Sequence, residues 1–355
     1  MQTLSSAVSL TPAAAPAVPG RRLAFSQLAI AACVLALCVV VLGAWVRLSH
    51  AGLGCPDWPG CYGHLDVPEA PHLIDAANAA WPDRPVEPAK AWKEMIHRYA
   101  AGTLGLLILA VAVSAWRRRA EPGQALALPL ALVGLVLFQA LLGMWTVTLL
   151  LKPLVVLAHL LGGLTTLALL FWLALRHSGW QPSPASADER RRHAGWALAA
   201  LLVLVAQIVL GGWTSTNYAA LACPELPTCQ GQWWPPTDFA DAYLPWRGLG
   251  INYEGGVLDN EARMTIHVMH RVGALLALAV LGTLAWRLGR STDAALRRGG
   301  WLLAAGLAAQ LLLGVGNVLL SLPLPVAVAH NAGAAGLLLV VLVLNHLLHP
   351  RRLPA

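Results

Sequence analysis

Eight long apolar segments run through this chain, and they restrict its fold more than any other feature of the sequence. A helix that crosses a lipid bilayer needs about 20 mostly apolar residues, because each residue adds only about 1.5 Å along the helix axis. The segments that meet this requirement are roughly 25–46, 94–116, 126–150, 153–175, 194–214, 264–288, 300–321 and 324–347. Only 12% of the 355 residues are charged, and the stretches between the segments are too short for a large soluble domain. We therefore predict an all-α membrane protein with eight transmembrane helices.

The basic residues lie mainly on one side of the predicted membrane. If the N-terminus is inside, 15 of the 24 Lys and Arg residues fall in the inner segments, whereas 13 of the 17 acidic residues fall in the outer ones. Inner loops of membrane proteins carry such an excess of basic residues, so both termini are predicted to be cytoplasmic. The net charge of +7 comes from these inner arginines and does not indicate nucleic-acid binding. The expected setting is the lipid bilayer of a bacterial plasma (inner) membrane.

The two halves of the chain carry the same short motifs in the same order, which indicates an internal duplication. The matching motifs are Gly43-Ala44-Trp45 with Gly211-Gly212-Trp213, Cys55-Pro56-x4-Cys61 with Cys223-Pro224-x4-Cys229, His97-Arg98 with His270-Arg271, Gln139-x3-Gly143 with Gln310-x3-Gly314, and Ala158-His159 with Ala329-His330. Matching cysteines and histidines lie 168 to 173 positions apart. Because each half has an even number of spans, both halves should have the same orientation in the membrane.

This repeat divides the chain into two tandem pseudo-symmetric four-helix bundles. The predicted units are a disordered N-terminal tail (1–21), an N-terminal four-helix half (22–176), a cytoplasmic linker (177–193), a C-terminal four-helix half (194–348) and a C-terminal tail (349–355).

Two cysteine pairs fall in predicted outer loops, where the compartment is oxidising. Cysteines six positions apart can close a small disulfide loop, so we predict the disulfides Cys55–Cys61 and Cys223–Cys229. The alternatives are two reduced pairs, a redox role for one of the disulfides, and a metal site, although Cys-x5-Cys is not a common zinc spacing. Redox activity of the pairs stays open at this stage.

Histidine is rare in transmembrane helices, where ionisable side chains are costly and tend to be functional. Four histidines nevertheless lie near the outer ends of predicted spans, in two matched pairs: His97 with His159, and His270 with His330. Two imidazoles that face each other across a helix bundle suit the axial ligation of haem iron, whereas zinc requires a third or fourth ligand. Small residues follow each histidine and either let a flat macrocycle lie against the backbone or simply allow helices to pack closely.

The neighbours of these histidines distinguish the two halves. Glu94 precedes His97 by three residues and should share its helix face, whereas His267 stands in the corresponding place before His270. Glu94 is a candidate for proton transfer or charge stabilisation, and the simpler interpretation is an acid at a helix N-terminus. Arg98 and Arg271 can contact haem propionates or extend to the membrane interface.

These motifs, taken together, resemble the haem A synthase family. The resemblance covers residues 22–348 and rests on Glu94-x2-His97-Arg98, His270-Arg271, the paired His159 and His330, the duplicated four-helix plan and the Cys-x5-Cys loops. Members of that family convert haem O to haem A, for use in terminal oxidases, by oxidising the C8 methyl group to a formyl group through successive hydroxylations.

The resemblance also implies roles for individual residues. It places the substrate haem O between His97 and His159, a haem B cofactor between His270 and His330, and the catalytic acid at Glu94. Haem O synthase and an electron donor are the expected partners. Whether His267 or His270 binds the second iron stays open.

Two other functions are compatible with parts of this pattern. A di-haem b-type electron-transfer cytochrome of the quinol-oxidising kind explains the four histidines but not the single Glu94. A transporter explains the repeat, but here the polar residues lie near one membrane face and the predicted helices are unbroken.

Overall fold

The computed structural model describes residues 19–121, 123–124, 126–178 and 186–349, and over these residues it is helical with only two isolated bridges in loops. The helices are α1 (Pro19–Leu48), α2 (Pro71–Ala80), α3 (Pro88–Arg117), α4 (Ala127–Thr148), α5 (Pro153–His177), α6 (Ala187–Thr216), α7 (Phe239–Ala242), α8 (Asn260–Gly289), α9 (Ala294–Leu319) and α10 (Leu324–Leu348). Among these, eight are long and apolar enough to cross a membrane, and α2 and α7 are the exceptions. The chain is an all-α integral membrane protein, which confirms the predicted fold class.

Several spanning helices begin well before the apolar segments from which they were predicted. Helix α3 starts at Pro88, because proline is well suited to the first turn of a helix. Three others begin in polar sequence behind side chains that accept a hydrogen bond from a main-chain N–H of the first turn, namely Ser186, Asp259 and Asp293. Hydropathy marks only the apolar part of such helices, so the predicted starts at 94, 194, 264 and 300 are too late.

Three predicted segments fall partly outside the described residues. These are residues 1–18 of the N-terminal tail, 179–185 of the linker and 350–355 of the C-terminal tail. Within the described part of the predicted linker, α6 already begins at Ala187, so the last residues before 194 are helical.

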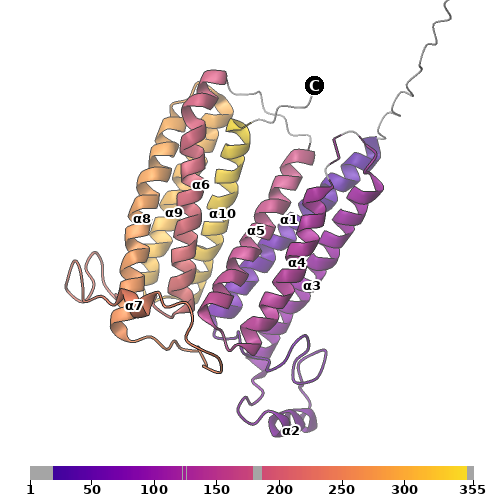
Figure 1. Ribbon diagram of the computed structural model, residues 1–355, viewed down its shortest axis with the longest axis vertical. Helices are drawn as coiled ribbons and strands as arrows, with labels where there is room; N and C mark the ends of the chain where they lie inside the picture. The colour runs from indigo at the N-terminus through magenta and orange to yellow at the C-terminus, as the bar shows by residue number, and fades with distance from the viewer. Residues whose placement is uncertain (1–18, 122, 125, 179–185, 350–355) are drawn as a thin grey trace, which may run out of the picture.

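The spanning helices form two groups of four that lie side by side (Figure 1). In the first group α1 and α4 each contact α3 and α5, and in the second group α6 and α9 each contact α8 and α10. Helices α3 and α5 are therefore diagonal neighbours across the interior of their group, and so are α8 and α10. The groups meet where α1 and α5 contact α10 and where α5 contacts α6. This arrangement is consistent with the predicted tandem bundles.

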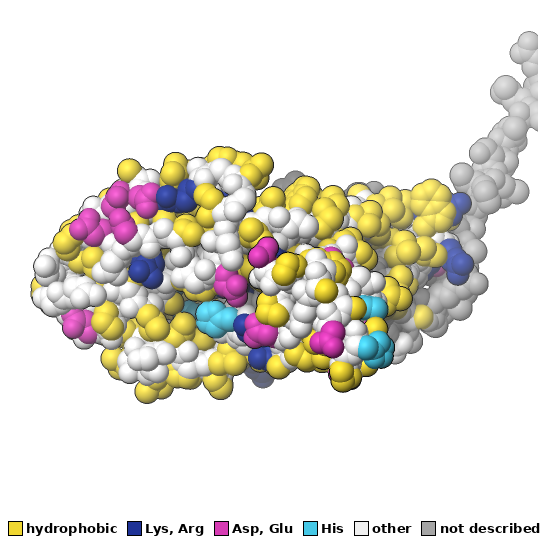
Figure 2. Space-filling view, turned by 90° about the horizontal axis from the view of Figure 1, so that it is seen from below, with side chains coloured by type: hydrophobic (Ala, Val, Ile, Leu, Met, Phe, Trp, Pro, Cys, Tyr) yellow, Lys and Arg dark blue, Asp and Glu magenta, His cyan; other side chains and the backbone are white. Residues whose placement is uncertain are grey.

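The two disulfide loops, α2 and α7 all lie at the same end of the molecule, which we call the loop end (Figure 1). Seen from below, the loop end carries scattered acidic, basic and histidine side chains with hydrophobic side chains around them (Figure 2). A continuous cluster of buried apolar side chains fills both groups and their junction, with Leu167, Leu170, Leu281 and Leu284 fully buried. Many other leucines of the spans are exposed, as expected of helices that face lipid.

Helices α1, α4, α6 and α9 all end at the loop end with the same turn. In each, a main-chain N–H bonds to the carbonyl five residues earlier: Ala51 to Val46 (3.0 Å), Leu151 to Thr146 (2.8 Å), Ala219 to Thr214 (3.0 Å) and Leu322 to Asn317 (2.7 Å). The residue before each donor has a positive φ, as this type of helix end requires. The structure therefore repeats a pair of helices four times, whereas the sequence comparison found only the twofold repeat.

Candidate functional site

Each of the four candidate histidines packs against a glycine of the membrane-spanning helix that precedes its own. A β-carbon built on that glycine would meet Cε1 of the imidazole at 3.1 Å for Gly43 and His97, 3.4 Å for Gly143 and His159, 3.1 Å for Gly211 and His270, and 3.2 Å for Gly314 and His330. The glycines lie on α1, α4, α6 and α9, three residues before the carbonyl that accepts the terminal turn bond. All four imidazoles therefore occupy equivalent places in the fourfold repeat.

The structure brings the histidines together in the predicted pairs. His97 on α3 lies within electrostatic range of His159 on α5, and His270 on α8 within range of His330 on α10. Each pair comes from diagonal helices, so both side chains point into the interior of one four-helix group. This is the geometry in which a bundle holds a cofactor between facing side chains.

The chemistry of this donor set fits a haem in each group. Nδ1 of His97, His159 and His330 is buried and has no hydrogen-bond partner among the described residues. The described residues contain no group of three or more His, Cys, Asp and Glu side chains that could hold a metal ion by themselves. Two neutral imidazoles with unfilled hydrogen-bonding capacity suit an iron whose other four ligands come from a macrocycle.

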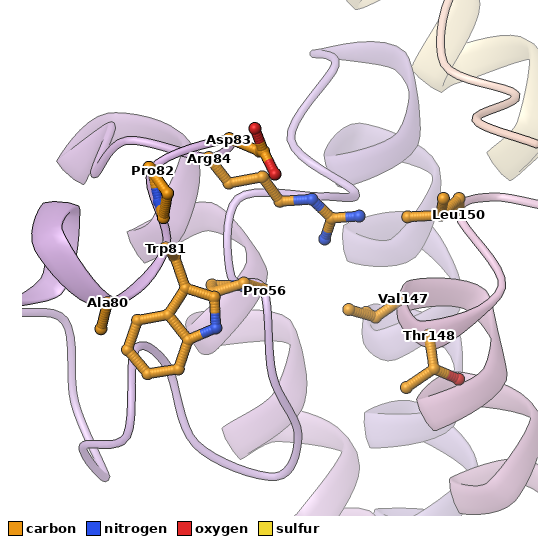
Figure 3. A pocket seen from close by; sticks show the side chains of 9 residues that line it. All are labelled: Pro56, Ala80, Trp81, Pro82, Asp83, Arg84, Val147, Thr148 and Leu150. Atoms are coloured by element: carbon orange, nitrogen blue, oxygen red, sulfur yellow. The ribbon is translucent and has the colours of Figure 1, made fainter. Parts of the chain in front are cut away.

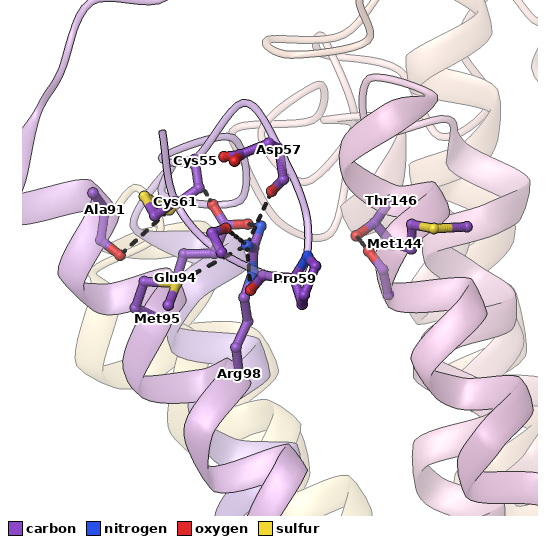
Figure 4. Close-up of polar contacts among 12 residues, drawn as sticks. Cys55, Asp57, Pro59, Cys61, Ala91, Glu94, Met95, Arg98, Met144 and Thr146 are labelled. Carbon is purple, nitrogen blue, oxygen red and sulfur yellow. Dashed lines mark hydrogen bonds and ion pairs between the residues drawn. A yellow bond between two sulfur atoms is a disulfide. The ribbon is translucent and has the colours of Figure 1, made fainter. Parts of the chain in front are cut away.

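Glu94 is not at a helix terminus. Helix α3 begins at Pro88, its first turn contains no acid, and Glu94 is 5% exposed in the second turn. Its carboxylate accepts a hydrogen bond from the main-chain N–H of Cys55 at 3.0 Å and forms an ion pair with Arg98 (Figure 4). The interpretation as a helix-terminal acid is therefore wrong, because an N1 proline starts the helix six residues earlier.

Arg98 and Arg271 fasten the two disulfide loops to their helices. Arg98 donates to the carbonyls of Asp57 (3.0 Å) and Gly60, and Arg271 donates to the carbonyls of Cys223 and Glu225, both at 2.8 Å. The sequence did not indicate these carbonyl contacts, because a partner about 40 residues away leaves no local signal. A contact of either arginine with a haem propionate stays a prediction.

His267 occupies the place of Glu94 in the second group but contacts a different part of the chain. Its Nδ1 lies 3.0 Å from the carbonyl of Ala219, the residue that closes the terminal turn of α6. Its neighbour His270 packs on Gly211 and faces His330, as described above. The geometry thus favours His270, rather than His267, as an iron ligand.

Comparison with known proteins places the chain in a family. A family model described as cytochrome oxidase assembly protein matches residues 26–342. This chain belongs to that family. Among curated relatives, the protein named Heme A synthase of Shewanella oneidensis is 49% identical over 89% of this chain and 94% of its own length. The protein of the same name from Caulobacter vibrioides is 30% identical over 88% of this chain and 91% of its own length.

Both cysteine pairs of this family member are disulfides in the structure. The S–S distances are 2.03 Å for Cys55–Cys61 and 1.97 Å for Cys223–Cys229. Each loop is closed further by a carboxylate that accepts main-chain hydrogen bonds, Asp57 in the first and Glu225 in the second. The bond from the N–H of Gly231 is the main reason why the pKa of Glu225 lies below its usual value.

We expect mass mapping of the unreduced protein to recover Cys55 linked to Cys61 and Cys223 linked to Cys229. Cys33 and Cys38 of α1 are free and serve as internal controls, because they should be alkylated once the protein is unfolded without reductant. Alkylation of all four loop cysteines under the same conditions would contradict the assignment.

A pocket of 410 Å³ lies beside the first disulfide loop, at a place that no sequence motif marked. The side chains of Pro56, Trp81 and Arg84 border it on one side, and Val147 and Leu150 at the end of α4 border it on the other (Figure 3). None of the four histidines lines it. The sequence missed these residues because the pocket forms only where the loop before α3 meets the end of α4.

Polar contacts also join the two halves of this family member at the loop end. Arg47 donates to the hydroxyl of Tyr218 at 2.7 Å and to the carbonyl of Ser215 at 2.9 Å. Lys152 donates to the carbonyl of Gly248 at 2.8 Å, and the same ammonium lies over the ring of Trp246. These contacts link the ends of α1 and α4 to the second half.

Proposed function

We propose that this protein is a haem A synthase, an oxidoreductase that converts haem O to haem A by oxidising the C8 methyl group to a formyl group through successive hydroxylations. Membership of the cytochrome oxidase assembly family and the names of its relatives support this proposal. The observation that carries it is the inequality of two otherwise equivalent sites. Both groups hold a diagonal histidine pair, but among the described residues only the first has a buried carboxylate, Glu94, one turn from a histidine of its pair.

In this proposal the first group binds the substrate. His97 and His159 hold the iron of haem O and so fix the orientation of its ring, while the apolar interior of the bundle excludes water. Glu94 lies on the same helix face as His97, and its carboxylate can stabilise positive charge that develops at the attacked carbon or accept a proton from it. Arg98 and the N–H of Cys55 fix the position of that carboxylate.

The second group holds the cofactor in the same proposal. His270 and His330 would hold a haem B, which would supply electrons for the oxidation when bound. His267 contributes no carboxylate there, in keeping with a haem that transfers electrons and is not itself modified.

The arrangement in the membrane follows from the charge distribution. We infer that both termini are cytoplasmic and that the disulfide loops face the outer side of a bacterial plasma membrane. Both histidine pairs then lie toward the outer face, together with the disulfides that an oxidising compartment maintains. Haem O synthase, as the source of the substrate, and an electron donor are the partners that this reaction requires.

Pigment analysis tests the proposed activity. Membranes from cells that make haem O should contain haem A only when this protein is also produced. Membranes in which the protein carries haem but no haem A forms would instead favour a di-haem electron-transfer cytochrome.

A further inference from the structure

Three glutamines make the same contact with three of the four histidines. The side-chain amide N–H of Gln139 donates to the main-chain carbonyl of His159 at 3.2 Å. Gln207 bonds to the carbonyl of His270 at 3.1 Å, and Gln310 to that of His330 at 3.0 Å. Each glutamine stands one helical turn before the glycine on which the corresponding imidazole packs.

A glycine three residues after each of these histidines makes room for the amide. A β-carbon at Gly162, Gly273 or Gly333 would collide with the amide of Gln139, Gln207 or Gln310, respectively. These glycines therefore allow the helices to interlock through the glutamines. The amides are buried between helices, where no water replaces a lost hydrogen bond, so each contact resists separation of its two helices.

Two of these amides also lie next to the imidazole ring of their histidine. Nε2 of Gln207 is 3.1 Å from Nδ1 of His270, and Nε2 of Gln310 is 3.3 Å from Nε2 of His330. The amide oxygens of all three glutamines are buried without a partner among the described residues. Each amide N–H donates to the main-chain carbonyl of its histidine, so the glutamine fixes the stretch of helix that carries the imidazole.

His97 is the exception. Val39 stands one turn before Gly43, where the other three helices have glutamine, and Ala100 stands where the other three have glycine. Valine offers no hydrogen bond to the carbonyl or to the ring.

We propose that Gln139, Gln207 and Gln310 are positioning residues that keep His159, His270 and His330 as fixed iron ligands, and that His97 is the ligand that dissociates when haem is exchanged. This inference rests on the proposed function, in which the first group takes up haem O and releases haem A in every cycle while the second keeps its haem B. Hydrogen-bonded partners of metal ligands commonly change metal affinity by about 10- to 100-fold. Because one of its two ligands lacks such a partner, the first site can release its haem. The second ligand, His159, remains fixed and still orients the substrate.

Reciprocal exchange of the two residue pairs tests this assignment. The double variant Gln207→Val with Gly273→Ala gives the second group the environment of His97, and the double variant Val39→Gln with Ala100→Gly does the reverse. The full-length purified protein is loaded with haem O and haem B and mixed with an excess of a haem-scavenging protein. Chromatography of the haem that remains bound then gives a separate release rate for each haem.

The first variant should release haem B about 10-fold faster than the wild type. Its ferric haem B should also bind cyanide about 10-fold faster, because cyanide replaces an axial histidine. The second variant should release haem O about 10-fold more slowly. The control is Val34→Gln, which adds a glutamine to α1 at a lipid-facing position that is 58% exposed, and it should leave both rates unchanged.

The outcomes separate this inference from the proposed function. Unchanged rates of haem B release and cyanide binding in Gln207→Val with Gly273→Ala would overturn the positioning role, even if the other double variant does not fold. Haem O binding that survives in both His97→Ala and His159→Ala would instead overturn the proposed substrate site.

Discussion

Replacing Glu94 with glutamine should lower haem A formation by about 100-fold or more, while the haem B content and the amount of folded protein stay close to those of the wild type. The side chain keeps its shape and its hydrogen-bonding oxygen, but it loses the charge and the ability to accept a proton. A partly oxidised, hydroxylated haem should accumulate if the later oxidation step depends on the carboxylate more than the first. Chromatography of haems extracted from cells that make normal amounts of the variant measures all three quantities.

The second half of the molecule shows why this variant should fold. Arg271 holds its disulfide loop through hydrogen bonds to carbonyl oxygens and forms no ion pair among the described residues, because His267 stands in the place of Glu94. The carboxylate of Glu225 acts on Arg271 only at longer range. Arg98 has the equivalent carbonyl contacts and can hold the first loop in the same way. The carboxylate of Glu94 is therefore not required to anchor the loop. We expect its loss to affect catalysis rather than folding.

The matched control is Glu225→Gln, which removes a carboxylate of the second disulfide loop whose hydrogen bonds go to Thr228 and Gly231 and not to a histidine. It should keep wild-type amounts of haem A. If Glu94→Gln also gave wild-type amounts of haem A, Glu94 would have no catalytic role and would serve only to bind Arg98 and Cys55.

Alanine substitutions of the four histidines should divide them into two classes, one that loses haem B and one that keeps haem B but forms no haem A. His270→Ala and His330→Ala should deplete the tightly bound haem B, because each removes one of two axial ligands. His97→Ala and His159→Ala should leave that haem in place and reduce haem A formation to background. Haem B per protein and haem A per membrane are measured on the same preparations.

His267→Asn is the control for this series, because asparagine can still hydrogen-bond to the carbonyl of Ala219. It should retain haem B and thereby assign the iron to His270. Loss of the only tightly bound haem from the His97 and His159 variants, with retention in the other two, would reverse the assignment of the halves.

Local sequence features determined a large part of this structure. The number of spans followed from apolar length alone, since a bilayer imposes one minimum length on every helix. The two cysteine loops followed from a spacing of six residues. These features depend on residues that lie close together in the sequence, so they can be predicted without knowing how distant segments pack.

Contacts between distant segments were decided only by the tertiary structure. The fourfold repetition of the helix pair was not evident in the sequence, because the glycines of α1, α4, α6 and α9 become equivalent only when the helices are superimposed in space. The position of Glu94 inside α3 depended on a proline that hydropathy does not register.

The hydrogen-bond partners of the polar side chains are the clearest example of what only the tertiary structure decides. Gln207 and His270 are 63 positions apart, and Arg98 lies 41 positions from Asp57, yet each pair is joined by a hydrogen bond. The sequence identified the residue types that can bind haem and supply an acid, because burying such groups in a membrane is costly. Packing of the whole bundle decides which helices are adjacent and which are diagonal. It therefore also decides which histidine each glutamine contacts.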